Sequence, residues 1–183
     1  MNPFLDLHPR SESARPVRSF GDDQVSSSAT STIRERLNWP ITPELYDRIR
    51  RLWIKHSIAE DQRDIAGLLA TLAEDCTYEL VPTGQRWEGH DGARSFYESF
   101  LGAFPDVHFE LKDIVIGPQG VIEVAEMTGT HRGEWAGLLP TGRLVRLLVI
   151  IHFPWDPAAE KFGGERVYFD RASLGEATGK TSS

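Results

Sequence analysis

Apolar residues in the first part of the chain recur at helical spacing. A helix is predicted to begin at Thr42, because its hydroxyl can cap free amides, Pro43 suits the first turn and Glu44 opposes the positive end of the helix dipole. One face of this helix carries Leu45, Ile49, Leu52, Trp53 and His56. The pattern predicts an amphipathic helix that needs an apolar surface to cover.

Two more apolar stripes at helical spacing follow. The first is short and consists of Ile65, Leu68, Leu69 and Leu72. Asp91 is the expected N-cap of the second, which consists of Phe96, Tyr97, Phe100, Leu101 and Phe104. Three amphipathic helices in a row predict a sheet in the rest of the chain, because their apolar faces must be covered.

The second part of the chain alternates apolar and polar residues, as strands do. The alternating runs are residues 76–81, 107–112 and 121–130. Residues 144–153 are apolar on both faces, which predicts a central strand covered on both sides. Prolines and glycines after residue 153 predict a long loop before a last strand, residues 165–172. The order predicts an α+β fold with helices on one face of a bent sheet.

Length and composition predict one folded domain with polar ends. The chain has 183 residues, enough for a single domain. Residues 1–38 lack apolar periodicity and predict a flexible N-terminal arm, residues 39–175 form the domain, and residues 176–183 predict a flexible tail. No signal or transit peptide is recognised, and the single cysteine, Cys76, excludes an intrachain disulfide, so we expect a cytoplasmic protein.

Charge and motifs argue against several classes of partner. A net charge of −7 disfavours nucleic acid, and no apolar run reaches the length of a membrane span. The phosphate-binding patterns GxGxxG and GxxxxGK[ST] are absent, so we expect no cofactor. His131, His152, Glu126 and Asp170 could supply metal ligands, but no HxH or HExxH spacing supports them, so we expect no metal.

Asp170 is the first candidate for acid/base chemistry. It follows Val167, Tyr168 and Phe169 at the end of the last strand, and apolar neighbours would raise the pKa of its carboxyl. The alternative is an ion pair with a neighbouring arginine, or a turn cap at the end of the strand.

Two histidines lie close to this region in the predicted sheet. His152 ends the preceding strand, where a hairpin could bring it near Glu165 or Asp170; the alternative is a core histidine bonded to a carbonyl. His131 lies in an irregular glycine-rich connection, where it either contacts substrate or fixes the loop.

The candidate substrate-binding residues are mostly aromatic or apolar. Trp135 and Leu138 on the same connection could close over an apolar ligand, with Tyr78 and Trp87 on the opposite wall. Glu126 could pair with Asp170 to hold a water molecule, as an epoxide hydrolase would require.

The segments FPDVHFE, GTHRGEWAGLLPTGR and GERVYFD, in that order between Phe104 and Asp170, resemble the SnoaL-like polyketide cyclases of the nuclear-transport-factor-2-like superfamily. The resemblance implies a cone-shaped barrel made of a curved, mostly antiparallel sheet covered by three N-terminal helices. It also implies a catalytic aspartate at the YFD position, Asp170, with a histidine such as His152 beside it. Leu80 and Val81 stand where ketosteroid isomerase would carry its base, so simple ketosteroid isomerisation is not expected.

These observations predict a cofactor-independent enzyme that acts on an apolar, oxygenated small molecule by aldol cyclisation, isomerisation or dehydration. Asp170 would move the proton, while His152 or His131 holds the developing enolate. Two alternatives stay open: a module that only binds a small molecule or dimerises, and an epoxide hydrolase. A homodimer through the open sheet is expected.

Overall fold

The computed structural model describes residues 32–179. The helices are α1 (Ile33–Arg36), α2 (Pro43–Asp61), α3 (Ile65–Leu69), α4 (Gly89–Ala103) and α5 (Arg171–Thr178). The strands are β1 (Leu72–Leu80), β2 (Gln85–Glu88), β3 (His108–Gly117), β4 (Gly120–Thr130), β5 (Leu144–Asp156) and β6 (Lys161–Phe169). Most of the predicted arm lies outside the described residues. None of the described helices is long and apolar enough to cross a membrane.

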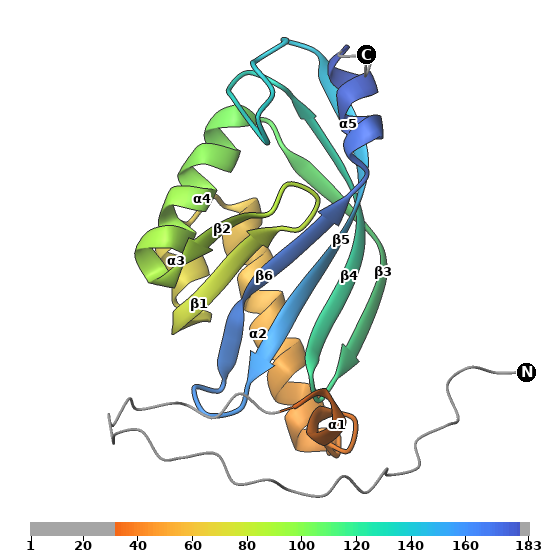
Figure 1. Ribbon diagram of the computed structural model, residues 1–183. Helices are drawn as coiled ribbons and strands as arrows, with labels where there is room; N and C mark the ends of the chain where they lie inside the picture. The colour runs from red at the N-terminus through yellow and green to blue at the C-terminus, as the bar shows by residue number, and fades with distance from the viewer. Residues whose placement is uncertain (1–31, 180–183) are drawn as a thin grey trace, which may run out of the picture. The chain divides into compact units, whose positions relative to one another are not determined.

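The six strands form one curved sheet in the order β2-β1-β6-β5-β4-β3. Neighbouring strands are antiparallel except β1 and β6, which run parallel. Helices α2, α3 and α4 lie on one face of the sheet, which we call the inner face; the opposite face is the outer face (Figure 1). The α+β prediction is confirmed, and the curved sheet stays open at its two edge strands, β2 and β3.

Local patterns explain where the first helices begin. Thr42 is extended, and its hydroxyl accepts a hydrogen bond from the Leu45 amide at 3.2 Å, as an N-cap does. Asp91 was expected to cap the third helix, but α4 starts at Gly89 and Asp91 lies within its first turn. The N-cap residue is Glu88, whose side chain makes no capping hydrogen bond, so the predicted cap by Asp91 is wrong.

Strand β5 follows a strict alternation of buried and exposed residues. Its buried side chains, which face the helices, are Val145, Leu147, Val149, Ile151, Phe153 and Trp155. Leu144, Leu148 and Ile150 are exposed on the outer face. The prediction that this strand is covered on both sides is therefore wrong for the described chain, because nothing in it packs over the outer face.

The connection between β5 and β6 is shorter than predicted. Strand β5 continues to Asp156 and β6 begins at Lys161, so both strands extend through the prolines and glycines that predicted a loop. Between the pairs His152–Arg166 and Trp155–Phe162, β6 contains one residue more than β5. This bulge includes Gly164, whose φ is +109° and where an added Cβ would lie 2.0 Å from the Thr77 carbonyl oxygen.

The bulge changes which side chains of β6 face inward. Phe162 is buried against the helices, and strict alternation from it would place Glu165 on the outer face. With one extra residue, Glu165 turns inward and Arg166 turns outward. The next element, α5, was not predicted, and it includes the first three residues of the expected C-terminal tail, 176–178.

Candidate active site

A cavity of about 30 Å³ lies between the inner face of the sheet and helices α2 and α4. This volume is enough for about two water molecules. Its walls are apolar, and the aromatic ones are Phe96, Phe100, Phe104, Phe109, Trp135 and Phe169. Glu60 and Glu165 are the ionisable side chains among the described lining residues. The cavity therefore combines apolar walls with two carboxyl groups.

Glu165 is held by groups from three other elements. Its Oε1 accepts hydrogen bonds from the Tyr78 hydroxyl at 2.8 Å and the Tyr97 hydroxyl at 2.6 Å, and lies 3.0 Å from His56 Nε2. The side chain is only 3% exposed. The hydrogen bonds of the Glu165 side chain within residues 32–179 are all made by Oε1, and Glu165 also lines the cavity. One oxygen is thus fixed, and the other is available to a bound molecule.

The hydrogen bonds of His56 define where its protons are. The Thr71 hydroxyl donates to the Leu68 carbonyl at 2.6 Å, so it can only accept from His56 Nδ1, which lies 2.6 Å away. Nδ1 therefore carries a proton. His56 Nε2 lies 3.0 Å from Glu165 Oε1 and 3.1 Å from the Tyr97 hydroxyl oxygen. It can therefore either donate to the carboxylate or accept from the Tyr97 hydroxyl.

Glu60 is the second carboxyl of the cavity. It lies four residues after His56 on α2, and therefore on the same face of the helix. Burial raises the pKa of Glu60 well above its ordinary value, and the nearby negative charges of Glu165 and Glu123 raise it further. These surroundings shift Glu60 toward its protonated form, compared with a carboxyl group in water.

A third buried carboxyl, Glu123, lies outside the cavity lining. Its Oε2 accepts a hydrogen bond from the Trp53 indole at 3.1 Å. Burial raises the pKa of Glu123 to about 6, although the Trp53 hydrogen bond opposes this. No three described His, Cys, Asp or Glu side chains converge as a metal site would require.

Asp170 does not lie where the sequence predicted. It is exposed, and its carboxylate accepts hydrogen bonds from the Ser173 hydroxyl at 2.6 Å and from the amides of Ala172 and Ser173 at 3.0 and 3.3 Å. These bonds, that of the Ser173 hydroxyl above all, lower the pKa of Asp170. The expected inward carboxyl with a raised pKa is wrong, because β6 ends at Phe169 and Asp170 serves as the N-cap of α5.

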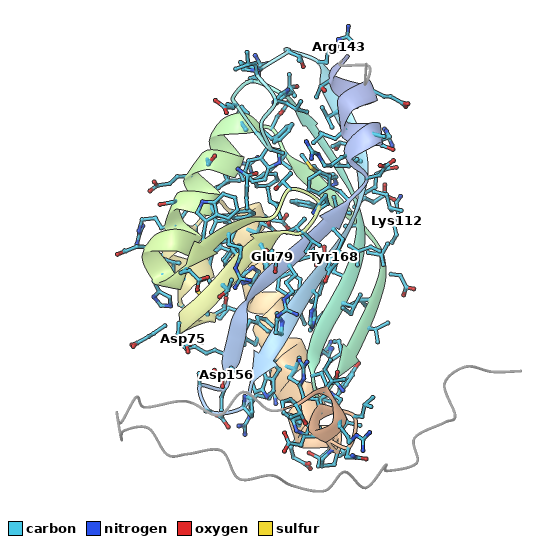
Figure 2. All side chains as sticks on the ribbon, in the orientation of Figure 1. Asp75, Glu79, Lys112, Arg143, Asp156 and Tyr168 are labelled. Atoms are coloured by element: carbon cyan, nitrogen blue, oxygen red, sulfur yellow. The ribbon has the colours of Figure 1, made fainter. Side chains whose placement is uncertain are left out.

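His152 and Glu126 lie on the outer face. His152 pairs with Arg166 across the strands, and burial together with the charge of Arg166 lowers its pKa. Glu126 forms an ion pair with Arg146. Neither residue lines the cavity, and the structure does not bring them together with Asp170 as a catalytic group. Figure 2 labels two other residues of the outer face, Glu79 and Tyr168, on the side turned away from α2.

His131 organises the connection between β4 and β5. Its amide donates to the Arg143 carbonyl, and its own carbonyl accepts from the amides of Thr141 and Gly142. The imidazole is buried, stacks on Phe104 with ring centres 5.3 Å apart, and has a pKa lowered by burial. These contacts favour the architectural alternative over a substrate contact.

The predicted aromatic residues are divided between site and core. Trp135 lines the cavity and packs on Phe100 with ring centres 5.0 Å apart, while Leu138 exchanges two backbone hydrogen bonds with it. Tyr78 reaches Glu165. Trp87 packs edge-on against a phenylalanine of α4 and does not line the cavity.

The sequence analysis missed the central residues of this site. His56 and Tyr97 were assigned to apolar helix faces, where a polar group among apolar ones already indicated a buried partner. Glu60 follows His56 by one helical turn, so it could have been placed beside it. Glu165 was considered only as a neighbour of His152, because the bulge that turns it inward cannot be read from the strand pattern.

Comparisons with known structures support the fold. A protein from Jannaschia sp. CCS1 assigned as a SnoaL-like polyketide cyclase is similar with a TM-score of 0.64, 16% identity and coverage of 79% of this chain and 100% of the other. AclR from Streptomyces galilaeus, a candidate hydroxylase, has a TM-score of 0.61, 21% identity and coverage of 75% and 99%. SalBIII, described as an epoxide hydrolase/cyclase-like enzyme in pyran ring formation in the polyether salinomycin, has a TM-score of 0.57, 18% identity and coverage of 69% and 94%.

Sequence comparison defines the family. No curated protein matches the sequence significantly. The family model of the SnoaL-like polyketide cyclases matches residues 44–177, which include every residue of the cavity and all of α2 to α5 except Pro43 and Thr178. The chain belongs to the SnoaL-like polyketide cyclase family.

Proposed function

We propose that this protein is a cofactor-independent acid/base enzyme that acts on an apolar, oxygenated small molecule in the cavity. The observation that carries the proposal is Glu165, whose Oε1 is fixed by three partners while its Oε2 lies unpartnered at an apolar cavity. This arrangement suits a general base that is oriented by its protein contacts and exposed only to a bound molecule. Family membership supports a cyclase-type reaction.

Each residue has a defined task in the proposed reaction. Oε2 of Glu165 removes a proton from a carbon next to a carbonyl, and the C–H electrons form the enolate. Glu60 donates its proton to the carbonyl oxygen, which neutralises the developing charge. The enol then takes the proton held by Glu165 at another, conjugated carbon, expels a β-hydroxyl group that leaves as water with this proton, or attacks a second carbonyl whose oxygen takes it. In each case the enol hydroxyl returns its proton to Glu60. These three steps correspond to isomerisation, dehydration and aldol cyclisation.

Tyr78, Tyr97 and His56 act through Glu165. The two hydroxyls lie 2.5 Å apart and both donate to Oε1, so the carboxyl cannot rotate without losing them. His56 Nε2 lies 3.0 Å from the same oxygen, so a proton on it would offset a negative charge on Glu165. These contacts keep the base in one orientation during turnover.

A second candidate function is the opening of an epoxide, by water or by a hydroxyl of the substrate. Two carboxyl groups face one cavity, and one of them, Glu60, is shifted toward its protonated form. Glu60 would protonate the epoxide oxygen while Glu165 takes the proton of the attacking oxygen. The similar fold of SalBIII, an epoxide hydrolase/cyclase-like enzyme, is consistent with this alternative. Glu60 and Glu165 replace Glu126 and Asp170 as the proposed pair.

Hydrogen–deuterium exchange on carbon tests the first function without the natural substrate. The protein is incubated with acetone, a ketone small enough for the cavity, in D₂O, and loss of the α-proton signal is followed by NMR. Replacement Glu165→Gln should slow the enzyme-dependent exchange by about 100-fold or more, as expected when a general base is removed. Asp170→Asn is the matched control, since it removes the charge of the other candidate acid, and it should leave exchange unchanged.

The same variants distinguish the proposed enzyme from three alternatives, which are catalysis by Asp170, epoxide opening and binding without catalysis. Exchange that survives in Glu165→Gln but is lost in Asp170→Asn would contradict the proposed base and restore Asp170. Opening of styrene oxide that requires both Glu60 and Glu165, without ketone exchange, would favour the epoxide reaction. A wild-type protein that binds these compounds and converts none of them would favour a binding module.

A further inference from the structure

The connection between β4 and β5 inserts one side chain into the wall of the cavity. Residues 132–144 are all exposed or half-buried except Trp135, which is 8% exposed and lines the cavity. The connection lies beside the end of α4, where the amides of Arg132 and Gly133 donate to the Ala103 carbonyl at 2.8 and 3.3 Å (Figure 1). A loop that is otherwise at the surface therefore supplies part of the cavity wall.

The turn that carries Trp135 is short and closed on itself. The amides of Trp135 and Leu138 each donate to the carbonyl of the other, at 3.0 and 2.8 Å. Ala136 and Gly137 between them have φ angles of +51° and +78°, as in a tight two-residue hairpin turn. A Cβ added at Gly137 would meet no atom within 4 Å. The tip of the turn thus has open space around it, while the indole points into the protein.

The indole lies close to the partners of the proposed base. Trp135 packs on Phe100 and Phe96, with ring centres 5.0 and 5.5 Å apart. The Phe96 ring in turn lies 4.8 Å from that of Tyr78, whose hydroxyl donates to Glu165 at 2.8 Å. Only the Phe96 ring therefore separates the indole from a residue that holds the proposed base.

The space left beside the indole is small. The cavity measures about 30 Å³, whereas a cavity of about 150 Å³ is needed to hold a benzene ring. An indole contains a benzene ring, so removal of the Trp135 side chain would leave room for a ring of that size. The other described lining residues, apart from Phe104, lie in helices or strands. Trp135 is therefore a wall residue that can change without altering a helix or a strand.

We propose that Trp135 determines the size of the substrate: its indole occupies the place that the body of a ring-sized ketone would take. A ketone as small as acetone binds beside the indole, and a ring ketone binds only when the indole leaves this place. The inference rests on the proposed function for the reaction, and it names the molecules that the same site accepts.

The test compares the exchange rates of acetone and cyclohexanone in D₂O, each followed by NMR and corrected for exchange without protein. The wild-type protein should favour acetone by about tenfold or more, because apolar pockets discriminate by about this factor for each misfitting methylene group. In Trp135→Ala this preference should fall by about tenfold or more, since the ring then enters the vacated space. The ratio of the two rates is the readout, so a general loss of activity does not affect it.

Trp87→Ala is the matched control. It makes the same substitution at a tryptophan that packs on Phe96 with ring centres 5.3 Å apart, outside the cavity lining. This variant should keep the wild-type ratio. The double variant Trp135→Ala/Glu165→Gln should lose the gained cyclohexanone exchange, because the ring ketone reacts at the same base.

A smaller truncation, Trp135→Leu, tests the inference even if the alanine variant does not fold. It should change the ratio in the same direction and by less. A wild-type protein that exchanges both ketones equally well would overturn the inference. So would a wild-type ratio in the folded Trp135 variants, or an equal change in Trp87→Ala.

Thermal unfolding in the presence of cyclohexanone gives a readout that requires no turnover, because a ligand raises the unfolding temperature of the protein that binds it. Cyclohexanone should stabilise Trp135→Ala more than the wild-type protein. This result in a protein that exchanges neither ketone would leave the size limit and remove the acid/base function. Acetone exchange that depends on Glu165, with a ratio and a stabilisation that Trp135 does not affect, would overturn only the size limit.

Discussion

The two faces of the sheet carry the same kinds of polar side chain and differ in what surrounds them. Tyrosine, histidine and glutamate occur on the inner side as Tyr78, His56 and Glu165, and on the outer face as Tyr168, His152 and Glu126. The inner three lie in one buried network beneath the helices. The outer three lie apart, and Glu126 is paired with a largely exposed arginine. Residue type alone therefore does not identify the candidate active site; shared burial does.

The largest difference between the two faces is expected in the free energy of unfolding. Replacement Glu165→Ala leaves His56 and two tyrosine hydroxyls buried without their common acceptor. We expect a loss of about 3–5 kcal/mol in the free energy of unfolding, the cost of breaking a buried charged network. Glu126→Ala on the outer face should cost no more than about 1 kcal/mol. Urea denaturation measures both, and equal losses would contradict the comparison.

The buried carboxyl groups on the inner side should also determine how stability changes with pH. Because the pKa of Glu123 rises from 4.5 to about 6 on folding, its protonated form favours the folded state below pH 4.5. That contribution is lost as the pH rises through about 6, and amounts to about 2 kcal/mol. Glu60, whose pKa is also raised, adds a loss of the same sign.

Two variants test this pH dependence. Glu123→Gln should flatten the fall of the unfolding free energy between pH 4.5 and 7, as measured by denaturation across that range. The contribution of the exposed Asp170 to stability changes with pH in the opposite direction. Its pKa is lowered on folding, so its stabilisation is present above its ordinary pKa and is lost in acid. Asp170→Asn should therefore leave the slope near pH 6 unchanged.

The outer face is where we predict the homodimer. Leu148 is 60% exposed and Ile150 is 40% exposed in the middle of the sheet, with Arg146 and Glu126 beside them. Apolar residues rimmed by charges of both signs can pair with a second copy of the same surface. Leu148→Glu should halve the mass measured by light scattering and leave ketone exchange unchanged. A wild-type monomer would contradict the prediction.

The smallest effect is expected at Asp170. Replacement Asp170→Ala removes the N-cap of α5 and should lower the unfolding temperature slightly, because the first amides of the helix lose their acceptor. Thermal unfolding followed by circular dichroism measures it. Since the carboxylate does not line the cavity, ketone exchange should be unaffected. A large loss of exchange would instead support Asp170 as the catalytic acid.

Local patterns allowed the fold to be predicted, whereas the site depends on contacts between distant parts of the chain. The Thr42 cap and the alternation in β1 require only neighbouring residues. The contact between His56 and Glu165 joins residues 109 positions apart, and no spacing rule connects them. Asp170 was misassigned for a related reason, since a strand end and a helix N-cap favour the same residue type.

The bulge at Gly164 has a consequence for how the chemistry of this sheet could change. Deleting one residue between Phe162 and Glu165 would remove the bulge and still leave Glu165 facing inward, two positions after Phe162. Pairing the full-length strand without the bulge would instead turn Glu165 to solvent and Arg166 toward the aromatic rings. One slipped register would thus exchange an acid for a guanidinium without any substitution, so the polarity of the pocket depends on strand pairing as well as on side-chain identity.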